Sequence, residues 1–247
     1  MQFLNKTAVI TGAGSGIGAL LAKCLSKEGA NVVLADINEE AITEIANEII
    51  GDGGSALAVV TDVTKYSDAK TCCDTAVEKY GSLDILVTCA GGSELRICKV
   101  SGEFHEVPID VFDFGLDLNL KGAFYFAHAA CAHMAKQNSG IIIPIGSITG
   151  HDGGGDVAYS TAKSGLMTGF VKSLAQYGAK HNIRAVCIAP GPVLTRPAMA
   201  GMKTLLGRAA ETQEIVDLIM YVASEKGAFL NGTTFLADGG RSALHRV

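Results

Sequence analysis

The sequence predicts an α/β fold in which a doubly wound parallel sheet of about seven strands carries helices on both faces. Two observations lead to this prediction. Short apolar runs alternate along the chain with longer stretches in which apolar residues recur at helical spacing. The short runs are apolar at nearly every position, which is typical of strands buried on both faces of a parallel sheet. No linker, repeat or low-complexity tract interrupts this alternation, so we expect one domain over residues 1–247.

The predicted strands are short runs rich in β-branched and aliphatic residues. In chain order they cover residues 7–11, 31–36, 56–62, 83–89, 140–146, 183–189 and 233–237. The helices between them are recognised by their spacing and their ends: Gly29 stops the first, Asn38 caps the second, and we expect Ser67 to cap the third. The predicted helices cover residues 17–27, 38–49, 67–80, 111–137, 157–180 and 213–223.

Composition excludes several classes of protein. The net charge is -5 and Lys and Arg form no stripe, so we expect no nucleic-acid partner. No apolar stretch reaches the ~18 residues that span a bilayer, and the first residues do not resemble a signal peptide, so we expect no membrane association. Seven cysteines without a paired motif indicate reduced thiols in a cytoplasmic protein. We also expect no metal site, because C-x-x-C and H-E-x-x-H are absent and the spacing of His128 and His133 does not place them on one helix face.

A glycine-rich segment, T-G-A-G-S-G-I-G over residues 11–18, follows the first predicted strand and opens the first helix. Glycines permit positive φ and let the backbone approach a ligand closely. The N-terminus of the following helix offers unpaired N–H groups and a partial positive charge to a pyrophosphate. A plain strand-to-helix turn is the alternative, but the position after the first strand favours a dinucleotide site in a Rossmann-type domain. Its candidate ligands are Gly12, Ser15, Gly16, Ile17 and Gly18.

Asp36 ends the second predicted strand, about 20 residues beyond the glycines. A carboxylate at this place can accept hydrogen bonds from the adenosine ribose hydroxyls and would repel a 2′-phosphate. Ile37 supplies no cation to offset that repulsion. The alternative is that Asp36 only begins the turn before Asn38. The position favours NAD over NADP.

Tyr159 and Lys163 lie four positions apart at the start of a predicted helix, so both side chains share one face. A tyrosine hydroxyl ordinarily titrates near pH 10, and a neighbouring ammonium helps it to exchange a proton near neutral pH. The spacing alone is weak evidence, because Tyr66 and Lys70 repeat it. Position separates the two pairs: Tyr159 follows the fifth strand, and Ser147 lies at the carboxyl end of that strand, where such sheets bind ligands. We interpret the other pair as a solvated helix face.

Taken together, these motifs resemble the short-chain dehydrogenase/reductase family over the whole chain. Residues 11–18 match its T-G-x-x-x-G-x-G, and Asp62-Val63 match its adenine-contacting pair. Asn119, Ser147, Tyr159 and Lys163 match its catalytic tetrad. The stretch from Pro190 through Val193 to Thr195 resembles the segment that touches the nicotinamide carboxamide.

The resemblance implies a role for each tetrad residue. Tyr159 exchanges a proton with the substrate oxygen, and Ser147 donates a hydrogen bond to that oxygen. Lys163 supports Tyr159 and binds the nicotinamide ribose. Asn119, through its main chain, holds a water that links Lys163 to solvent. The family also implies a homotetramer that pairs through the long helices 111–137 and 157–180.

The sequence departs from the family in two places. The usual N-N-A-G is Thr88-Cys89-Ala90-Gly91 here, so Cys89 replaces an amide on the adenosine side. We expect the backbone of Cys89, Ala90 and Gly91 to keep its cofactor contacts. The interval from Ser147 to Tyr159 is also one residue shorter than the family suggests, and we expect the glycines at 153–155 to absorb the difference.

The substrate is less clearly encoded. The segment 92–111 is longer than the family suggests and the lid 195–207 is shorter. Candidate substrate residues are Arg96, Ser147, His151 and Arg196. Because a guanidinium suits a carboxylate or phosphate, one hypothesis is an anionic substrate held by Arg96 or Arg196, and the competing one is an uncharged ring against the Met and Ala of the lid.

Three functions compete at this point. The leading one is an NAD-dependent oxidoreductase that interconverts a small-molecule secondary alcohol, such as a polyol, hydroxy acid, cyclic alcohol or steroid, and its ketone. The alternative is a 3-oxoacyl-thioester reductase acting on a carrier protein. Asp36 and the acidic net charge argue against it, because that role favours NADPH and a basic docking patch. A nucleotide-binding regulatory protein without chemistry is the third, and the intact tetrad argues against it.

Overall fold

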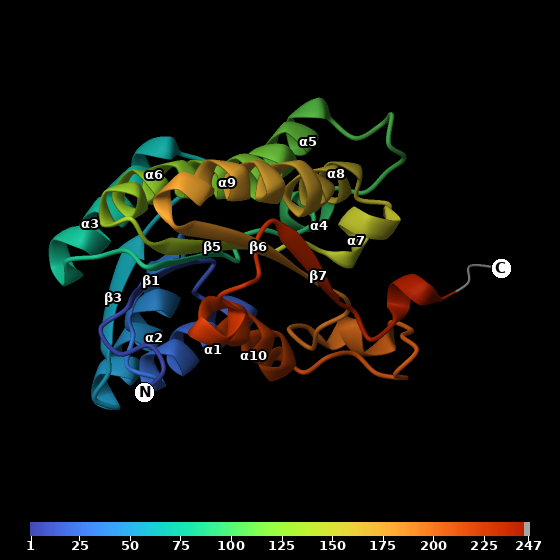
Figure 1. Cartoon of the computed structure of the whole chain (residues 1–247). Helices are drawn as coiled ribbons and strands as arrows, with labels where there is room; N and C mark the ends of the chain where they lie inside the picture. Colours follow the sequence, from blue (N-terminus) through green and yellow to red (C-terminus); the bar gives the residue numbers. More distant parts are fainter. Residues whose placement is uncertain (245–247) are drawn as a thin grey trace.

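The computed structural model describes residues 1–244 and contains a seven-stranded sheet in the order β3-β2-β1-β4-β5-β6-β7 (Figure 1). Every pair of neighbouring strands is parallel. The strands are β1 (Thr7–Thr11), β2 (Asn31–Asp36), β3 (Ser55–Val60), β4 (Ile85–Thr88), β5 (Gly140–Pro144), β6 (Ile183–Pro190) and β7 (Thr233–Ala237). The predicted fold class is therefore confirmed.

Helices cover both faces of the sheet. In Figure 1, α1 (Gly16–Lys27), α2 (Glu39–Gly51) and α10 (Thr212–Ala223) lie on one face, and α3 (Tyr66–Tyr80), α6 (Gly122–Gln137) and α9 (Val171–Gly178) lie on the other. Each face has its own core of buried aliphatic side chains, with Leu21 and Ile42 in one and Phe126 and Met134 in the other. The remaining helices are α4 (Glu94–Cys98), α5 (Ile109–Leu116), α7 (Ile148–Asp152) and α8 (Val157–Gly165), with short 3₁₀ turns at Ala179–His181, Pro197–Gly201, Glu225–Gly227 and Arg241–Ala243.

The two long predicted helices are each interrupted by a π-helical segment. The stretch 111–137 consists of α5, a π segment at Asp117–Lys121 and α6, and 157–180 consists of α8, a π segment at Leu166–Phe170 and α9. In the first, Asn119 Nδ2 donates to the Gly115 carbonyl at 2.9 Å, so a side chain enters the backbone ladder of the helix. Such an insertion is a recognised cause of helix irregularity, and periodicity alone does not reveal it.

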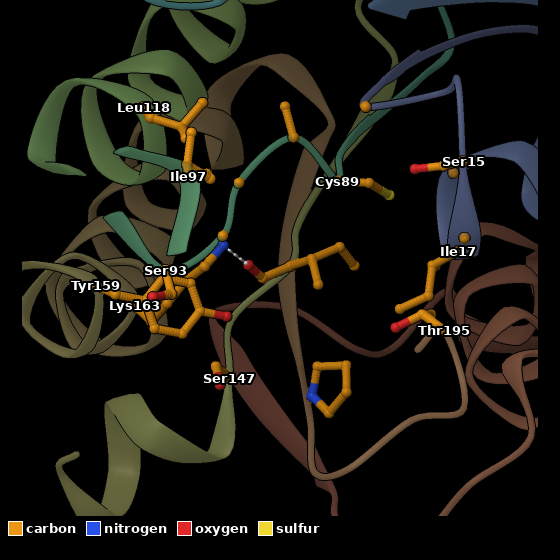
Figure 2. A pocket seen from close by; sticks show the side chains of 18 of the residues that line it. Ser15, Ile17, Cys89, Ser93, Ile97, Leu118, Ser147, Tyr159, Lys163 and Thr195 are labelled. Carbon is orange, nitrogen blue, oxygen red and sulfur yellow. Dashed lines mark hydrogen bonds between the residues drawn. The ribbon is translucent and has the colours of Figure 1, made fainter. Parts of the chain in front are cut away.

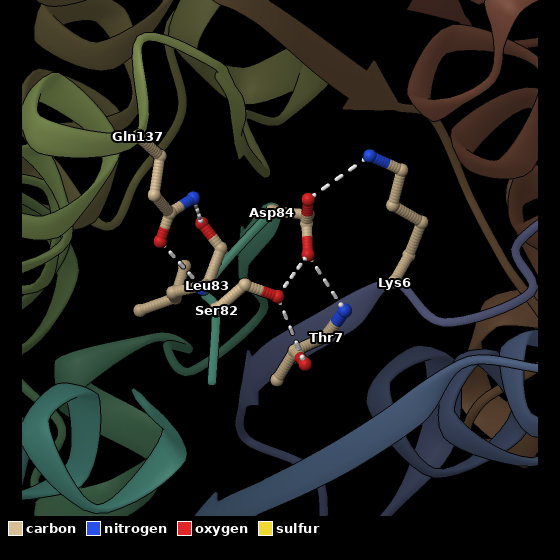
Figure 3. A network of polar contacts seen from close by, with 6 residues as sticks. All are labelled: Lys6, Thr7, Ser82, Leu83, Asp84 and Gln137. Atoms are coloured by element: carbon tan, nitrogen blue, oxygen red, sulfur yellow. Dashed lines mark hydrogen bonds and ion pairs between the residues drawn. The ribbon is translucent and has the colours of Figure 1, made fainter. Parts of the chain in front are cut away.

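Several smaller expectations were wrong. The third and fifth strands end at Val60 and Pro144, each two residues earlier than predicted. Ser67 does not cap α3, because the helix begins at Tyr66 with Lys65 at the N-cap, and the Ser67 hydroxyl instead donates to Asp68. The fourth strand begins at Ile85 rather than at residue 83, because the Gln137 side chain binds both the Leu83 N–H and its carbonyl, each at 2.9 Å (Figure 3).

All seven cysteines are free thiols, and most of them are shielded. Burial raises the pKa of Cys131 and Cys187 to about 11, and that of Cys72 and Cys89 to about 12. Cys98, at the end of α4, is exposed.

No helix within residues 1–244 is long and apolar enough to cross a membrane. In the same described residues, no group of three or more His, Cys, Asp or Glu side chains is placed to hold a metal ion.

Candidate active site

A cavity of about 790 Å³ opens at the carboxyl end of the sheet. Its walls are the residues that follow the strands: the glycine-rich loop after β1, Asp36 after β2, Asp62 after β3, and the segments after β4, β5 and β6. The predicted site residues that line it are Gly12, Ser15, Gly16, Ile17, Gly18, Asp36, Ile37, Asp62, Val63, Cys89, Ala90, Gly91, Arg96, Ser147, Tyr159, Lys163, Pro190, Val193, Thr195 and Arg196. Two predicted residues, Asn119 and His151, do not line it.

Figure 2 shows how these side chains divide the cavity. Ser147, Tyr159 and Lys163 lie at one end, Ser15, Ile17 and Thr195 lie at the other, and Cys89 lies between them. The parallel strand order places both ends at the same side of the sheet, where ligands bind in doubly wound folds.

The glycine-rich loop forms a narrow backbone cradle. Gly12 has φ +65°, and a Cβ there would lie 2.7 Å from the Ala90 nitrogen. A Cβ on Gly18 would lie 2.4 Å from the Gly12 carbonyl oxygen. Ser15 stands at the N-cap of α1, yet its side chain caps no N–H, and the first turn of α1 has no acidic residue. These unpaired amides at a helix N-terminus fit the pyrophosphate of a dinucleotide coenzyme.

Two carboxylates face the coenzyme end of the cavity. Asp36 accepts hydrogen bonds from the Gly14 and Asn38 N–H groups, each at 3.0 Å, which fixes its orientation. Burial alone would raise the pKa of Asp62, but hydrogen bonds from Thr64 and the nearby Lys65 outweigh it and hold that pKa below its usual value. Both side chains are therefore oriented hydrogen-bond acceptors, and Asp62 stays ionised near neutral pH.

Lys163 is the most deeply buried cation at the site. It is 3% exposed, and its Nζ donates to the Ile145 carbonyl at 2.8 Å (Figure 2). The same Nζ lies 5.6 Å from the centre of the Tyr159 ring, as their positions one turn apart on α8 predict. No carboxylate in the described residues forms an ion pair with Lys163.

Ser147 stands at the N-cap of α7 and is 9% exposed. Its Oγ accepts from the Thr149 N–H at 3.2 Å and lies 3.0 Å from the Thr149 hydroxyl. The short interval to Tyr159 holds α7 and three glycines, of which Gly153 has φ +76°. Ser147 and Tyr159 both line the cavity at this spacing.

Asn119 is 1% exposed and binds backbone groups instead of lining the cavity. Its Oδ1 accepts from the Gly92 N–H at 2.8 Å, and its Nδ2 donates to the Gly92 carbonyl at 2.9 Å. A Cβ on neighbouring Gly91 would lie 2.5 Å from Asn119 Oδ1 and 3.2 Å from Lys163 Nζ. The loop after β4 therefore fits closely against Asn119 and Lys163 because residue 91 is a glycine and has no Cβ.

Replacing the family's asparagine by Cys89 leaves the backbone pairing of this loop in place. The Cys89 N–H donates to the Thr11 carbonyl at 3.2 Å, and the Ala90 N–H donates to the Thr11 hydroxyl at 3.1 Å. Because the thiol is neutral at physiological pH, it adds no charge to the cavity.

The cavity lining also includes Arg96 and Arg196. Among residues 1–244 neither guanidinium has a carboxylate partner, whereas Arg208 forms a two-pronged ion pair with Glu214. His151 lies away from the cavity lining and contacts Asp152 at 2.8 Å. Met199 and Met202, which belong to the lid whose Met residues the sequence suggested as a surface for an uncharged ring, also line the cavity. Three further lining residues were not predicted, although the i, i+4 spacing of the first two was visible: Phe114, Leu118 and Asp156.

The second Tyr-x-x-x-Lys pair lies outside this cavity. Tyr66 is 39% exposed, and its hydroxyl is 2.8 Å from His128 Nδ1 on α6. Lys70 forms an ion pair with Asp74 on the same helix.

Comparisons with known proteins agree with this architecture. The family model described as short chain dehydrogenase matches residues 6–205. The chain is similar to trans-4-hydroxycyclohexanecarboxylate dehydrogenase of Sinomonas cyclohexanicum, at 37% identity over 97% of this chain and 93% of the relative. It is also similar to the cis-4-hydroxycyclohexanecarboxylate dehydrogenase of that organism, at 33% identity over 98% of both chains.

A steroid enzyme and a solved structure extend the comparison. The 7alpha-hydroxysteroid dehydrogenase of Bacteroides fragilis is 31% identical over 97% of this chain and 95% of its own length. The crystal structure of gox2181 superposes with a TM-score of 0.89 at 27% identity and covers 98% of both chains. The chain therefore belongs to the short-chain dehydrogenase family and is an oxidoreductase that acts on CH–OH groups.

Proposed function

We propose that this protein is an NAD-preferring enzyme that interconverts a secondary alcohol and its ketone, with Tyr159 as the acid and base. One observation carries the proposal: Ser147, Tyr159 and Lys163 line the same cavity as the glycine-rich loop and Asp36. A nicotinamide coenzyme would accept or supply the hydride. The protein's own part is to bind, orient and exchange the proton.

The chemistry of the chain follows from the placement of three side chains. In the oxidation direction the Tyr159 oxygen takes the proton of the substrate hydroxyl, and in the reduction direction its hydroxyl returns that proton to the ketone oxygen. Ser147 donates a hydrogen bond to the same oxygen and orients it. The buried ammonium of Lys163 lies one helical turn from Tyr159 and has N–H groups left for a ribose hydroxyl. Asn119 holds the loop after β4 against Lys163.

Asp36 supports the preference for NAD. Its carboxylate is fixed by two backbone N–H groups, and Ile37 beside it is exposed and uncharged. A 2′-phosphate near Asp36 would meet a negative charge that, within residues 1–244, forms no ion pair with a Lys or Arg. Steady-state kinetics with the same alcohol should give a much higher kcat/KM with NAD than with NADP, and equal values would reject this preference.

For the substrate, we propose a ring-sized secondary alcohol that carries a carboxylate. Two similar enzymes are named for hydroxycyclohexanecarboxylates, and the two cavity arginines lack a protein carboxylate in the described part of the chain. The hydroxysteroid relative favours the competing uncharged ring, which Met199 and Met202 would contact. A 3-oxoacyl-thioester reductase remains less well supported, because Asp36 and the net charge of -5 disfavour NADPH and an acidic carrier protein.

The test compares 4-hydroxycyclohexanecarboxylate with cyclohexanol. Arg96→Met or Arg196→Met should raise the KM for the acid by about tenfold or more and leave that for cyclohexanol unchanged, since a charge-assisted pair is lost. Arg208→Met is the control, because Arg208 lies outside the cavity. Equal KM values for both compounds in all variants would favour the uncharged substrate.

We also propose that the protein is a homotetramer and that it is cytoplasmic. A homotetramer paired through α6 and the α8–α9 region is supported by Phe124, which is 53% exposed and stacks near Phe170 at 5.9 Å between ring centres. A monomer in light scattering at micromolar concentration would contradict it. Seven free thiols are consistent with a cytoplasmic location.

A further inference from the structure

Glu94 is a carboxylate that the proposed chemistry does not use. It is 0% exposed, and no Lys, Arg or His in the described residues forms an ion pair with it. Its two oxygens accept hydrogen bonds from the Ala158 N–H at 3.2 Å and the Tyr159 N–H at 3.1 Å. A buried charge without a cation is unfavourable unless its oxygens are hydrogen-bonded, so these two contacts must fix its position.

The two N–H groups belong to the first turn of α8, the helix that carries Tyr159 and Lys163. Asp156 occupies the N-cap of α8, but its side chain makes no capping hydrogen bond. The cap is instead supplied from α4, whose Glu94 lies 64 positions from Ala158 in the sequence. A carboxylate at this place satisfies two unpaired donors and interacts favourably with the helix dipole.

The segment that carries Glu94 is held at its other end by Asn119. The Asn119 side chain forms two hydrogen bonds with the backbone of Gly92, two residues before Glu94. Its Nδ2 also donates to the Gly115 carbonyl. Gly115 leaves room for the carboxylate, since a Cβ there would lie 2.9 Å from Glu94 Cβ and 3.2 Å from Ala158 Cβ. The loop after β4 is therefore connected to the first turn of α8 through Glu94.

We propose that Glu94 is a positioning residue that fixes the start of α8 and, with it, the place of the Tyr159 hydroxyl opposite the substrate oxygen. The inference rests on the proposed role of Tyr159. Glu94 does not line the cavity, so it acts through the helix and not by contact with the reacting atoms. Small errors in the position of a reacting group reduce turnover strongly, which makes the effect measurable.

Two variants change this contact in different ways. Glu94→Gln keeps the size of the side chain but replaces one of the two accepting oxygens by an NH₂ donor, so the N–H that this oxygen bound loses its acceptor. It should lower kcat by about tenfold or more and leave the dissociation constant of NADH unchanged. Gly115→Ala keeps the Glu94 carboxylate but places a Cβ against the Glu94 side chain, which should displace it. We expect kcat to fall here too, by a smaller factor than in Glu94→Gln.

Asp84→Asn is the matched control. Like Glu94, Asp84 carries a carboxylate that binds a backbone N–H far away in the sequence, that of Thr7, at 3.0 Å. It also accepts from the Ser82 hydroxyl at 2.6 Å and forms an ion pair with Lys6 at 3.0 Å (Figure 3). It lies before β4, at the amino end of the sheet, opposite the cavity. Asp84→Asn should lower the Tm and leave kcat unchanged, which separates loss of stability from loss of positioning.

The outcomes are distinguishable. A fall in kcat for Glu94→Gln and Gly115→Ala, without one for Asp84→Asn at comparable Tm, supports the proposal. If kcat falls in step with Tm in all three variants, Glu94 is only structural and the proposal is overturned. If Glu94→Gln yields no folded protein, full kcat in Gly115→Ala overturns it. If Tyr159→Phe turns over as fast as the wild type, the proposed function itself fails. If Tyr159→Phe is inactive while Glu94→Gln and Gly115→Ala keep full kcat, only the inference about Glu94 fails.

Discussion

The chain contains the same Tyr-x-x-x-Lys pattern at the start of two helices, and the two copies have different surroundings. On α3, the Tyr66 hydroxyl contacts His128, and Lys70 is paired with Asp74 in a solvent-exposed position. On α8, no protein group within residues 1–244 hydrogen-bonds the Tyr159 hydroxyl, and Lys163 is buried against a single carbonyl. One pair has its polar groups occupied by neighbouring side chains, and the other keeps its hydroxyl available in a cavity.

The difference comes from the strand that precedes each helix. Both helices begin at the carboxyl end of the sheet, but β3 is an edge strand, whereas β5 is next to the central β4. After β3 the chain lines the cavity as far as Thr64 and then turns Tyr66 toward α6, where its ring meets that of Tyr125 edge to face at 5.7 Å between ring centres. Strand order, and not residue spacing, decides which tyrosine can meet a substrate.

Replacing each tyrosine by phenylalanine tests this comparison with the largest expected effect. Tyr159→Phe should keep the fold and NAD binding and lower kcat by about 10²–10⁴-fold, the range for a lost general acid or base. Tyr66→Phe should leave kcat unchanged, because it removes only the contact with His128. Turnover by purified variants measures both, and equal behaviour of the two would show that the choice between the pairs is wrong.

The lysines give a smaller contrast. Lys163→Met should lower kcat by about 10²-fold, because it removes a preorganised buried donor and leaves the Ile145 carbonyl without its partner. Lys70→Met loses an exposed ion pair with Asp74 and should change neither kcat nor, by more than a small shift, the Tm. A substantial activity loss in Lys70→Met would contradict the assignment of α3 as a structural helix.

The smallest expected effect concerns stability at low pH on the α3 side. The Lys70 hydrogen bond is the main cause that holds the pKa of Asp74 below 3.8; partial burial opposes it, and His133 adds to it. Because the folded pKa is lowered, ionised Asp74 contributes stability above about pH 4 and loses it as the pH falls through the folded pKa. The Tm difference between wild type and Asp74→Asn should be present at pH 7 and shrink as the pH is lowered below about 4. A Tm difference that does not change with pH would show that the ionised Asp74 carboxylate does not contribute to stability.

Most of the fold was predictable because strands and helices leave local patterns. Runs such as Thr7–Thr11 and Asn31–Asp36 were predicted to the residue, since burial on both faces makes them apolar throughout. The π segment around Asn119 was not predictable, because it involves a side-chain hydrogen bond to the Gly115 carbonyl that helical periodicity does not reveal. His151 illustrates the same limit: it lies between Ser147 and Tyr159 in the sequence but contacts Asp152 rather than the cavity.

The candidate site was predictable where family motifs are contiguous and not where contacts join distant segments. The glycine-rich loop, Asp36 and the Tyr159–Lys163 pair on α8 were predicted from sequence motifs and from their order relative to the predicted strands. Glu94 gave no signal, because nothing in its neighbourhood shows that it meets Tyr159. Phe114 and Leu118 follow helical spacing, but which face of that helix borders the cavity depends on packing.

The distribution of cysteines has a practical consequence for following this protein in solution. Reactivity toward electrophiles follows exposure and thiolate character, and both are low for the buried thiols. A maleimide dye at neutral pH should therefore attach mainly to Cys98, the exposed cysteine. That residue ends the short helix that begins with Glu94 and includes Arg96. The native sequence thus provides an attachment point from which fluorescence can report, without engineering, whether this helix moves when coenzyme and alcohol bind.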